Sequence, residues 1–256
     1  MIILFIFFLA LFGLTLGSFY NVVGLRIPNN QSIVAPRSAC PRCKHTLTAV
    51  ELIPVVSYVI QRGKCRSCGA RITPLYPFVE LLTGVLFAVA PLLVGWSFEL
   101  LIALTLISLF MIIFVSDLTY MLIPDKILLF FLGVFIVERV IYPLNPWYDS
   151  LIGAFVGFTL LLFIAYVSKG GMGGGDIKLF GLLGLVLGWK TVLLSFFLST
   201  FIGVIIGASF MLAGKHKKRE PMPFGPSIMI GTLIAYFFGE QLLNWYLSLI
   251  GYTVGG

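Results

Sequence analysis

Residues 1–25 read MIILFIFFLALFGLTLGSFYNVVGL and contain no charged side chain. A helix that spans a bilayer needs about 20 predominantly apolar residues, so this stretch is long enough to cross a membrane. It has no basic segment of the kind that opens a secretory signal peptide. We therefore expect a retained first transmembrane helix over 1–25 and not a cleaved leader.

The rest of the chain has the same apolar character. Hydrophobic residues make up 59% of the 256 residues and charged residues only 11%, against roughly 25% charged in average soluble proteins. With 24 Phe and a mean hydropathy of +1.07, the apolar surface exceeds what one soluble core buries. This composition excludes a soluble globular enzyme, a disordered protein and a small disulfide-stabilised scaffold.

We predict an all-α polytopic membrane protein with about eight transmembrane helices. Eight apolar segments are delimited by charged residues, Gly and Pro, at 2–24, 77–95, 99–116, 124–143, 150–168, 177–189, 191–213 and 224–250. The sixth segment is short for a full crossing, which leaves a tilted or partly re-entrant helix open.

The positions of Lys and Arg predict the orientation, because these residues concentrate in cytoplasmic loops. With the amino terminus outside, the inner side receives fifteen of the 17 Lys and Arg, and only Arg139 and Lys190 lie outside. The basic run KHKKRE at 215–220 then fits a topology-setting cytoplasmic loop. A patch for nucleic acid or anionic lipid is the alternative for that run. We expect the lipid bilayer as a partner and no nucleic acid.

All four cysteines lie in the large loop after the first span, in the pattern C-x2-C-x21-C-x2-C: Cys40, Cys43, Cys65 and Cys68. Each C-x2-C turn can direct two thiolates inward, and two such turns complete a tetrahedral zinc site without an open position. The predicted cytoplasmic location disfavours a disulfide framework. Redox-active or unmetallated thiols are the alternative. A loop of this size has too little core to fold alone, so we expect the zinc to be structural.

Two acidic residues at the predicted cytoplasmic ends of spans are candidates for acid–base chemistry. Asp117 closes the third span, where the helix dipole disfavours a carboxylate, and Asp176 opens the sixth span after GGMGGG, where the dipole favours it. Each aspartate alone is also explained by helix capping. Two carboxylates at one membrane depth, in contrasting environments, favour an acid/base pair.

Other hydrolytic chemistries lack their residues in this chain. The two histidines, His45 and His216, fall in predicted cytoplasmic loops, so a Ser–His triad inside the membrane has no base. The sequence contains neither H-E-x-x-H nor G-x-S-x-G. The alternative function from another class is a polytopic ion or proton-coupled transporter, although its inverted halves are not visible. A membrane scaffold that presents a zinc module is a further alternative.

Five ordered motifs resemble those of the type IV prepilin peptidases, a family of G-x-G-D membrane aspartic proteases. They are GSFYNVVGLRIP (17–28), the tetracysteine loop with ELIPVVSYVIQRGKC (51–65), DLTYMLIPD (117–125), GGGD (173–176) and PFGPSIMIG (223–231). They cover nearly the whole chain, and no motif residue is missing. The G-x-G-D string alone is a weak signal, whereas five motifs in order are a strong one.

The resemblance implies an enzyme that cleaves the short basic leader from prepilins or pseudopilins in a bacterial cytoplasmic (inner) membrane. Asp117 and Asp176 match the catalytic positions, whereas Asp125 is expected to cap the fourth span. The tetracysteine loop is typical of members that also N-methylate the new amino terminus with S-adenosylmethionine. The domain organisation then expected is a first transmembrane helix (1–25), a cytoplasmic zinc-binding loop (26–73) and a seven-helix protease core (74–256).

Overall fold

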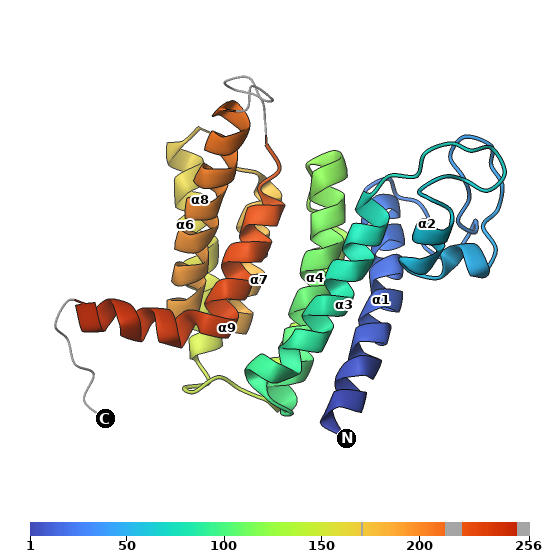
Figure 1. The fold of residues 1–256 in the computed structure, drawn as a ribbon. Helices are drawn as coiled ribbons and strands as arrows, with labels where there is room; N and C mark the ends of the chain where they lie inside the picture. Colours follow the sequence, from blue (N-terminus) through green and yellow to red (C-terminus); the bar gives the residue numbers. More distant parts are fainter. Residues whose placement is uncertain (170, 213–221, 250–256) are drawn as a thin grey trace. The chain divides into compact units, whose positions relative to one another are not determined.

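A computed structural model describes residues 1–169, 171–212 and 222–249 of the chain (Figure 1). Within these ranges the regular structure is helical, apart from two isolated antiparallel bridges, Ala39 with Thr46 and Lys64 with Arg71. The chain forms two compact units, Met1–Ile127 and Leu128–Gly256, and each is described by itself. The basic run at 215–220 lies outside the described residues, so its predicted role as a loop stays a prediction.

The first unit consists of three long helices and the cysteine loop. They are α1 (Ile2–Arg26), α3 (Leu75–Val94) and α4 (Phe98–Tyr120), and the loop between α1 and α3 carries the single turn Val50–Leu52 and the short helix α2 (Val56–Ile60). Helix α1 packs along α3, and both contact α4 (Figure 1). The Tyr120 hydroxyl donates to the Leu25 carbonyl at 3.2 Å. The carboxyl ends of α1 and α4 therefore meet at the end of the unit that holds the cysteine loop.

Two glycines one turn apart bring α1 close to α3. A Cβ atom added at Gly13 would lie 2.8 Å from the carbonyl oxygen of Thr83, and one added at Gly17 would lie 2.7 Å from the Cα atom of Glu80. Small residues at this spacing let helix backbones approach closely, which is how helices associate where lipid removes the hydrophobic driving force. Larger side chains here would separate the two helices.

The described residues of the second unit form four helices and most of a fifth. Helix α5 (Asp125–Ile141) crosses the boundary between the units, and α6 (Asp149–Val167), α7 (Gly174–Leu187), α8 (Trp189–Leu212) and α9 (Gly225–Leu249) follow. Helix α6 packs on α7 through Gly153 and Gly184, each of which lies against the backbone of the other helix. Helix α8 packs on α9, where Ser195 and Thr232 share a buried 2.6 Å hydrogen bond.

The helices α1 and α3–α9 correspond one by one to the eight apolar segments predicted from the sequence. Six of the helices in the described ranges, α1, α3, α4, α6, α8 and α9, are long and apolar enough to cross a membrane. Helices α5 and α7 contain 17 and 14 residues. At 1.5 Å per residue α7 is about 21 Å long, against a hydrocarbon core of about 30 Å. Full crossing by these two helices stays a prediction.

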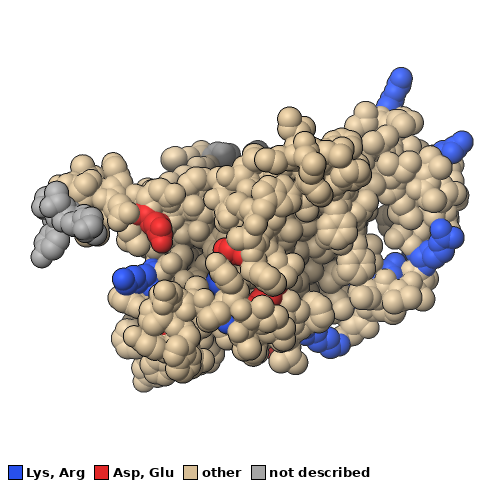
Figure 2. Space-filling model, turned by 90° about the horizontal axis from the view of Figure 1, so that it is seen from below, with Lys and Arg blue, Asp and Glu red and all other residues tan. Residues whose placement is uncertain are grey.

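The surface has the composition of a membrane protein. The face shown in Figure 2 is covered mainly by residues other than Lys, Arg, Asp and Glu, and its charged side chains are scattered. Large apolar side chains on the long helices, such as Phe5, Leu129, Phe155 and Leu212, are more than half exposed. Such exposure is normal where lipid is the solvent. The fold class predicted from the sequence, an all-α polytopic membrane protein, is confirmed.

Candidate functional site

The four cysteines lie on two turns with matching backbone hydrogen bonds. In the first turn the Cys40 N–H donates to the His45 carbonyl and the Lys44 N–H donates to the Cys40 carbonyl, both at 2.9 Å. In the second turn Cys65 N–H donates to Ala70 and Gly69 N–H donates to Cys65. The residue after the second cysteine of each pair, Lys44 or Gly69, has a φ above 60°, which glycine adopts without strain.

The two turns bring the four sulfur atoms together. All four Sγ atoms lie within 4.8 Å of one another, with Cys40 and Cys68 at 3.8 Å and Cys43 and Cys65 at 3.9 Å. Four Zn–S bonds of about 2.3 Å in a tetrahedron place neighbouring sulfurs about 3.8 Å apart. A disulfide needs an S–S distance of about 2.0 Å instead. The four thiols are therefore positioned to bind a metal ion, and their spacing fits zinc.

Backbone groups near Cys40 favour its charged thiolate, the form that a metal requires. The N–H groups of Cys43 and Arg42 donate to Cys40 and lower the pKa of its thiol to about 6. A thiol that ionises near neutral pH is a better metal ligand, because metal binding requires the thiolate. This arrangement supports a closed site with four protein ligands and no position for a catalytic water.

Glu51 organises the chain between the two cysteine turns. Its Oε2 atom accepts hydrogen bonds from the Thr48 N–H and hydroxyl, both at 2.9 Å, and lies 3.2 Å from His45 Nε2. These groups lower the pKa of the Glu51 carboxyl below its ordinary value, and the Thr48 N–H has the largest effect. Glu51 is only 8% exposed, so a buried anion ties the first cysteine turn to the following helical turn.

Asp117 lies inside the last turn of α4, because this helix continues to Tyr120 and not only to the predicted end at 116. The residue is 6% exposed. Its carbonyl oxygen accepts the N–H of Met121 at 2.9 Å, and Met121 ends the helix with a φ of 53°. The Asp117 carboxyl therefore lies at the end of the first unit that also carries the cysteine loop.

Asp176 lies in the first turn of α7, the position predicted from the sequence. Gly173 precedes the helix in an extended conformation, and its carbonyl accepts the Asp176 N–H at 3.1 Å. The Asp176 carboxylate folds back over this glycine, since a Cβ atom added at Gly173 would lie 3.0 Å from Asp176 Oδ2. Its half-buried side chain is thus held at the positive end of a helix, where an anion is favoured.

The predicted site residues divide between the two units. The first unit holds the four cysteines, which the structure brings together, and also Asp117 and Asp125. Asp125 is exposed in the first turn of α5, where a negative charge stabilises the start of the helix. Asp176 belongs to the second unit. The pairing of Asp117 with Asp176 stays a prediction.

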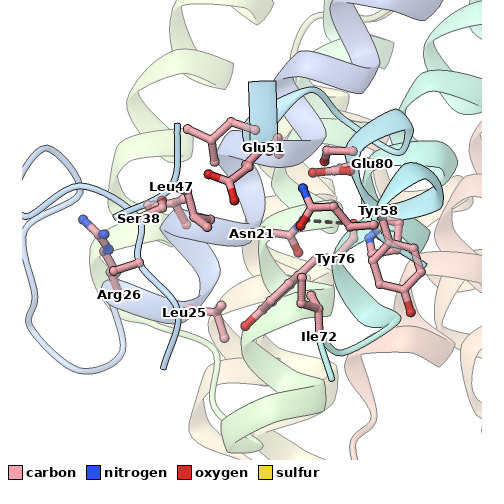
Figure 3. Close-up of a pocket in the computed structure, with 17 residues that line it drawn as sticks. Asn21, Leu25, Arg26, Ser38, Leu47, Glu51, Tyr58, Ile72, Tyr76 and Glu80 are labelled. Carbon is pink, nitrogen blue, oxygen red and sulfur yellow. Dashed lines mark hydrogen bonds between the residues drawn. The ribbon is translucent and has the colours of Figure 1, made fainter. Parts of the chain in front are cut away.

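The first unit also contains a cavity of about 250 Å³ between α1, α3 and the cysteine loop (Figure 3). Its polar lining includes Asn21, Glu51 and Glu80, which are 5%, 8% and 8% exposed. The Asn21 Nδ2 atom donates to the Tyr76 carbonyl at 3.1 Å, and Glu80 Oε2 accepts the Val55 N–H at 2.7 Å.

The sequence pattern indicates no role for these three polar residues. Glu51 falls within the expected cytoplasmic loop (26–73), and Glu80 falls near the start of the second predicted span (77–95). A signal does exist in the motif GSFYNVVGLRIP, because Ser18, Asn21 and Leu25 recur at helical spacing and share one face of α1. That signal was incomplete, because the opposite wall comes from residues 30 to 60 positions further along the chain.

Two family profiles match the chain. Residues 11–94 match the bacterial peptidase A24 N-terminal domain, and residues 104–208 match the type IV leader peptidase family. The first match covers most of α1, the cysteine loop and α3, and the second includes both Asp117 and Asp176. No solved structure matches the chain significantly.

Several curated proteins are similar over nearly their whole length. A prepilin leader peptidase/N-methyltransferase of Bacillus subtilis (strain 168) is 49% identical over 241 residues, which cover 94% of this chain and 97% of the relative. Proteins of the same name from Aeromonas salmonicida (strain A449) and Legionella pneumophila are 35% and 31% identical, and at least 93% of each chain is covered. This chain belongs to the type IV leader peptidase family.

Proposed function

We propose that this protein is a bifunctional membrane enzyme that cleaves the leader from type IV prepilins or pseudopilins and N-methylates the new amino terminus. The observation that carries the proposal is the similarity to proteins named for both activities over 94% of this chain. The five ordered motifs and the metal-binding cysteine cluster support it.

The protein acts in the bacterial cytoplasmic (inner) membrane, with its amino terminus outside. The distribution of Lys and Arg supports this orientation. In the first unit, Asp117 shares an end with the cysteine loop, so both then face the cytoplasm. A prepilin whose apolar helix lies in the bilayer presents its basic leader and scissile bond at this same surface.

The cleavage reaction is general acid–base hydrolysis by Asp117 and Asp176. One carboxylate, ionised, takes a proton from the attacking water, and the other, protonated, polarises the scissile carbonyl and then protonates the leaving amine. The place of Asp176 at the amino end of α7 favours its anionic form, so we assign it as the base. Asp117, buried in the last turn of α4, is then the acid.

The methylation reaction uses the amine that cleavage exposes. When bound, S-adenosylmethionine would supply a methyl group to this amine, which would give up a proton to water. The closed four-cysteine site leaves no ligand position for catalysis, so the metal supports this activity only by stabilising the fold of the loop.

The decisive experiment incubates purified protein with a synthetic prepilin, with and without S-adenosylmethionine, and identifies the products by mass spectrometry. We expect a leader-less product in both reactions, and one that is heavier by a single methyl group when the methyl donor is present. An Asp176→Asn protein that retains its zinc should leave the precursor uncleaved. Cleavage without any methylation would limit the function to the peptidase.

A further inference from the structure

The cavity between α1, α3 and the cysteine loop has no part in the aspartate mechanism. More than half of its lining residues nevertheless come from the two motifs that this mechanism leaves unexplained, GSFYNVVGLRIP (17–28) and ELIPVVSYVIQRGKC (51–65). On α1, Ser18, Asn21 and Leu25 line it at intervals of three and four residues, so one helical face is directed at it (Figure 3).

Two buried acceptor atoms in this cavity lack a hydrogen-bond partner in the part of the chain that the structure describes. They are Asn21 Oδ1 and Glu51 Oε1, although the other polar atom of each side chain is bonded. Buried polar atoms in proteins are almost always paired, so an orphaned acceptor indicates a missing donor. The two side chains belong to separate elements and line one cavity, so a ligand that carries hydrogen-bond donors matches this lining.

The charges of the lining specify the ligand further. Glu51 and Glu80 place two carboxylates in the cavity wall, and both side chains are more than nine-tenths buried. Buried anions require a compensating positive charge or strong donors. Arg26 lines the same cavity, where a guanidinium suits a carboxylate. Tyr58, Tyr76 and several aliphatic side chains complete the wall.

We propose that this cavity is the methyl-donor site and receives the methionine end of S-adenosylmethionine, an inference that rests on the proposed methyltransferase function. The sulfonium and α-ammonium groups of the donor supply the positive charge and N–H groups that Asn21 and Glu51 lack, and its carboxylate pairs with Arg26. A cavity of about 250 Å³ lies just below the common range of about 300–1,000 Å³ for ligand pockets. It therefore holds the amino-acid end and leaves the nucleoside near its mouth.

A methyl-donor site in this cavity would make methylation depend on the metal-binding loop. Glu51, Ser57 and Tyr58 come from the segment between the two cysteine turns, so folding of the loop creates half of the walls. Glu80 holds this segment to α3 through the N–H of Val55, whose φ of 62° is unusual for a β-branched residue.

The cleaved substrate also carries an α-ammonium group and could occupy the same cavity as the methyl donor. The test therefore measures the binding of each ligand separately. Full-length protein with its metal is purified in detergent as wild type, Glu51→Gln, Asn21→Leu and Glu240→Gln. Glu240 is an exposed carboxylate of the second unit and provides the matched control. Equilibrium dialysis measures the affinity for radiolabelled S-adenosylmethionine and, separately, for a leader-less prepilin peptide. Zinc content and the melting temperature identify properly folded variants.

We expect Glu51→Gln and Asn21→Leu to bind S-adenosylmethionine at least tenfold more weakly and Glu240→Gln to bind within twofold of wild type. If Glu51→Gln loses zinc, Asn21→Leu decides, because it lies on α1 outside the metal loop. Folded variants with unchanged donor affinity would overturn the proposal, and so would loss of peptide affinity alone. Wild-type protein that neither binds nor uses the donor would instead refute the methyltransferase function itself.

Discussion

At the scale of single residues, the three aspartates of the two motifs differ in their surroundings. Asp117 is buried in the last turn of α4, and Asp176 is half-buried at the start of α7. Asp125 is exposed in the first turn of α5. An exposed carboxylate at a helix start is explained by the helix dipole alone. Exposure thus separates the expected catalytic pair from the expected structural residue.

We therefore expect Asp117→Asn and Asp176→Asn to abolish prepilin cleavage, whereas Asp125→Asn retains most of it. Asparagine keeps the size of the side chain but can neither accept the proton from water nor donate one to the leaving amine, and loss of general acid–base catalysis typically costs about 10²–10⁴-fold in rate. Cleavage is measured in membranes at matched protein levels. Equal inactivation by all three substitutions would contradict this ranking.

Glu51 gives the metal-binding loop a dependence on pH. The Thr48 N–H and hydroxyl and His45 lower the pKa of its carboxyl, so the folded loop binds this proton more weakly than the unfolded loop. The resulting stabilisation is complete above the ordinary pKa of about 4.3 and is lost as the pH falls through the lower pKa of the folded state.

The measurement is hydrogen exchange at the Thr48 amide, compared between wild type and Glu51→Gln from pH 7 to pH 3.5. We expect wild type to be better protected at neutral pH and the difference to close on acidification. Acid release of the metal affects both proteins, so their difference isolates Glu51. A difference that does not shrink as the pH falls would assign the effect to packing instead of charge.

At the scale of elements, the cysteine loop depends on its metal more than the helices do. Replacing Cys65 by Ser leaves three thiolates, and a loop with so little core loses the stability that metal binding supplies. We expect the Cys65→Ser protein to lose zinc and to methylate far less than it cleaves, because the loop forms part of the cavity wall whereas the aspartates lie on α4 and α7.

Both activities are to be measured in membranes at matched protein levels, with metal content determined on the purified protein. A zinc-free Cys65→Ser protein that methylates normally would contradict the role given to the loop. A folded protein that cleaves nothing would show that the peptidase also depends on the loop.

The contact between α6 and α7 holds the helix that carries Asp176. A side chain at Gly184 would run into the backbone of Gly153, so Gly184→Leu forces the two helices apart. Overpacking of this kind costs about 1–3 kcal/mol or more. We expect the Gly184→Leu protein to have a lower melting temperature. We also expect its cleavage activity to fall by more than its amount in the membrane.

The matched control is Gly133→Leu in α5, where an added Cβ atom meets nothing within 4 Å. Leucine favours a helix over glycine, so this variant should melt no lower than wild type. Thermal unfolding in detergent measures both proteins. A Gly184→Leu protein as stable as Gly133→Leu would refute the close contact.

At the scale of the whole molecule, the orientation in the membrane decides where both reactions occur. An epitope inserted after Trp96, in the short turn between α3 and α4, should be reached by antibody on intact protoplasts. An epitope inserted after Val34, in the cysteine loop, should be reached only after permeabilisation. The physical reason is the concentration of Lys and Arg on the loop side. The reverse pattern would place the aspartates outside and contradict the proposed substrate topology.

Composition and local spacing determined the fold class, the positions of the helices and the pairing of the cysteine turns. These properties are local: an apolar segment of sufficient length forms a helix in lipid whatever its neighbours, because its backbone groups must be satisfied internally. The C-x2-C spacing likewise fixes each turn by itself. The five ordered motifs also indicated the family, and the comparisons with known proteins confirm it.

Only the tertiary structure decided which polar side chains converge. Helix α1 is apolar along almost its whole length, so its sequence does not distinguish a face toward lipid from a face toward α3. The close approach at Gly13 and Gly17 makes that choice, and Asn21 then lines the same cavity as Glu51 and Glu80 from two other segments. Long-range packing, which no local pattern encodes, therefore created the cavity beside the metal centre.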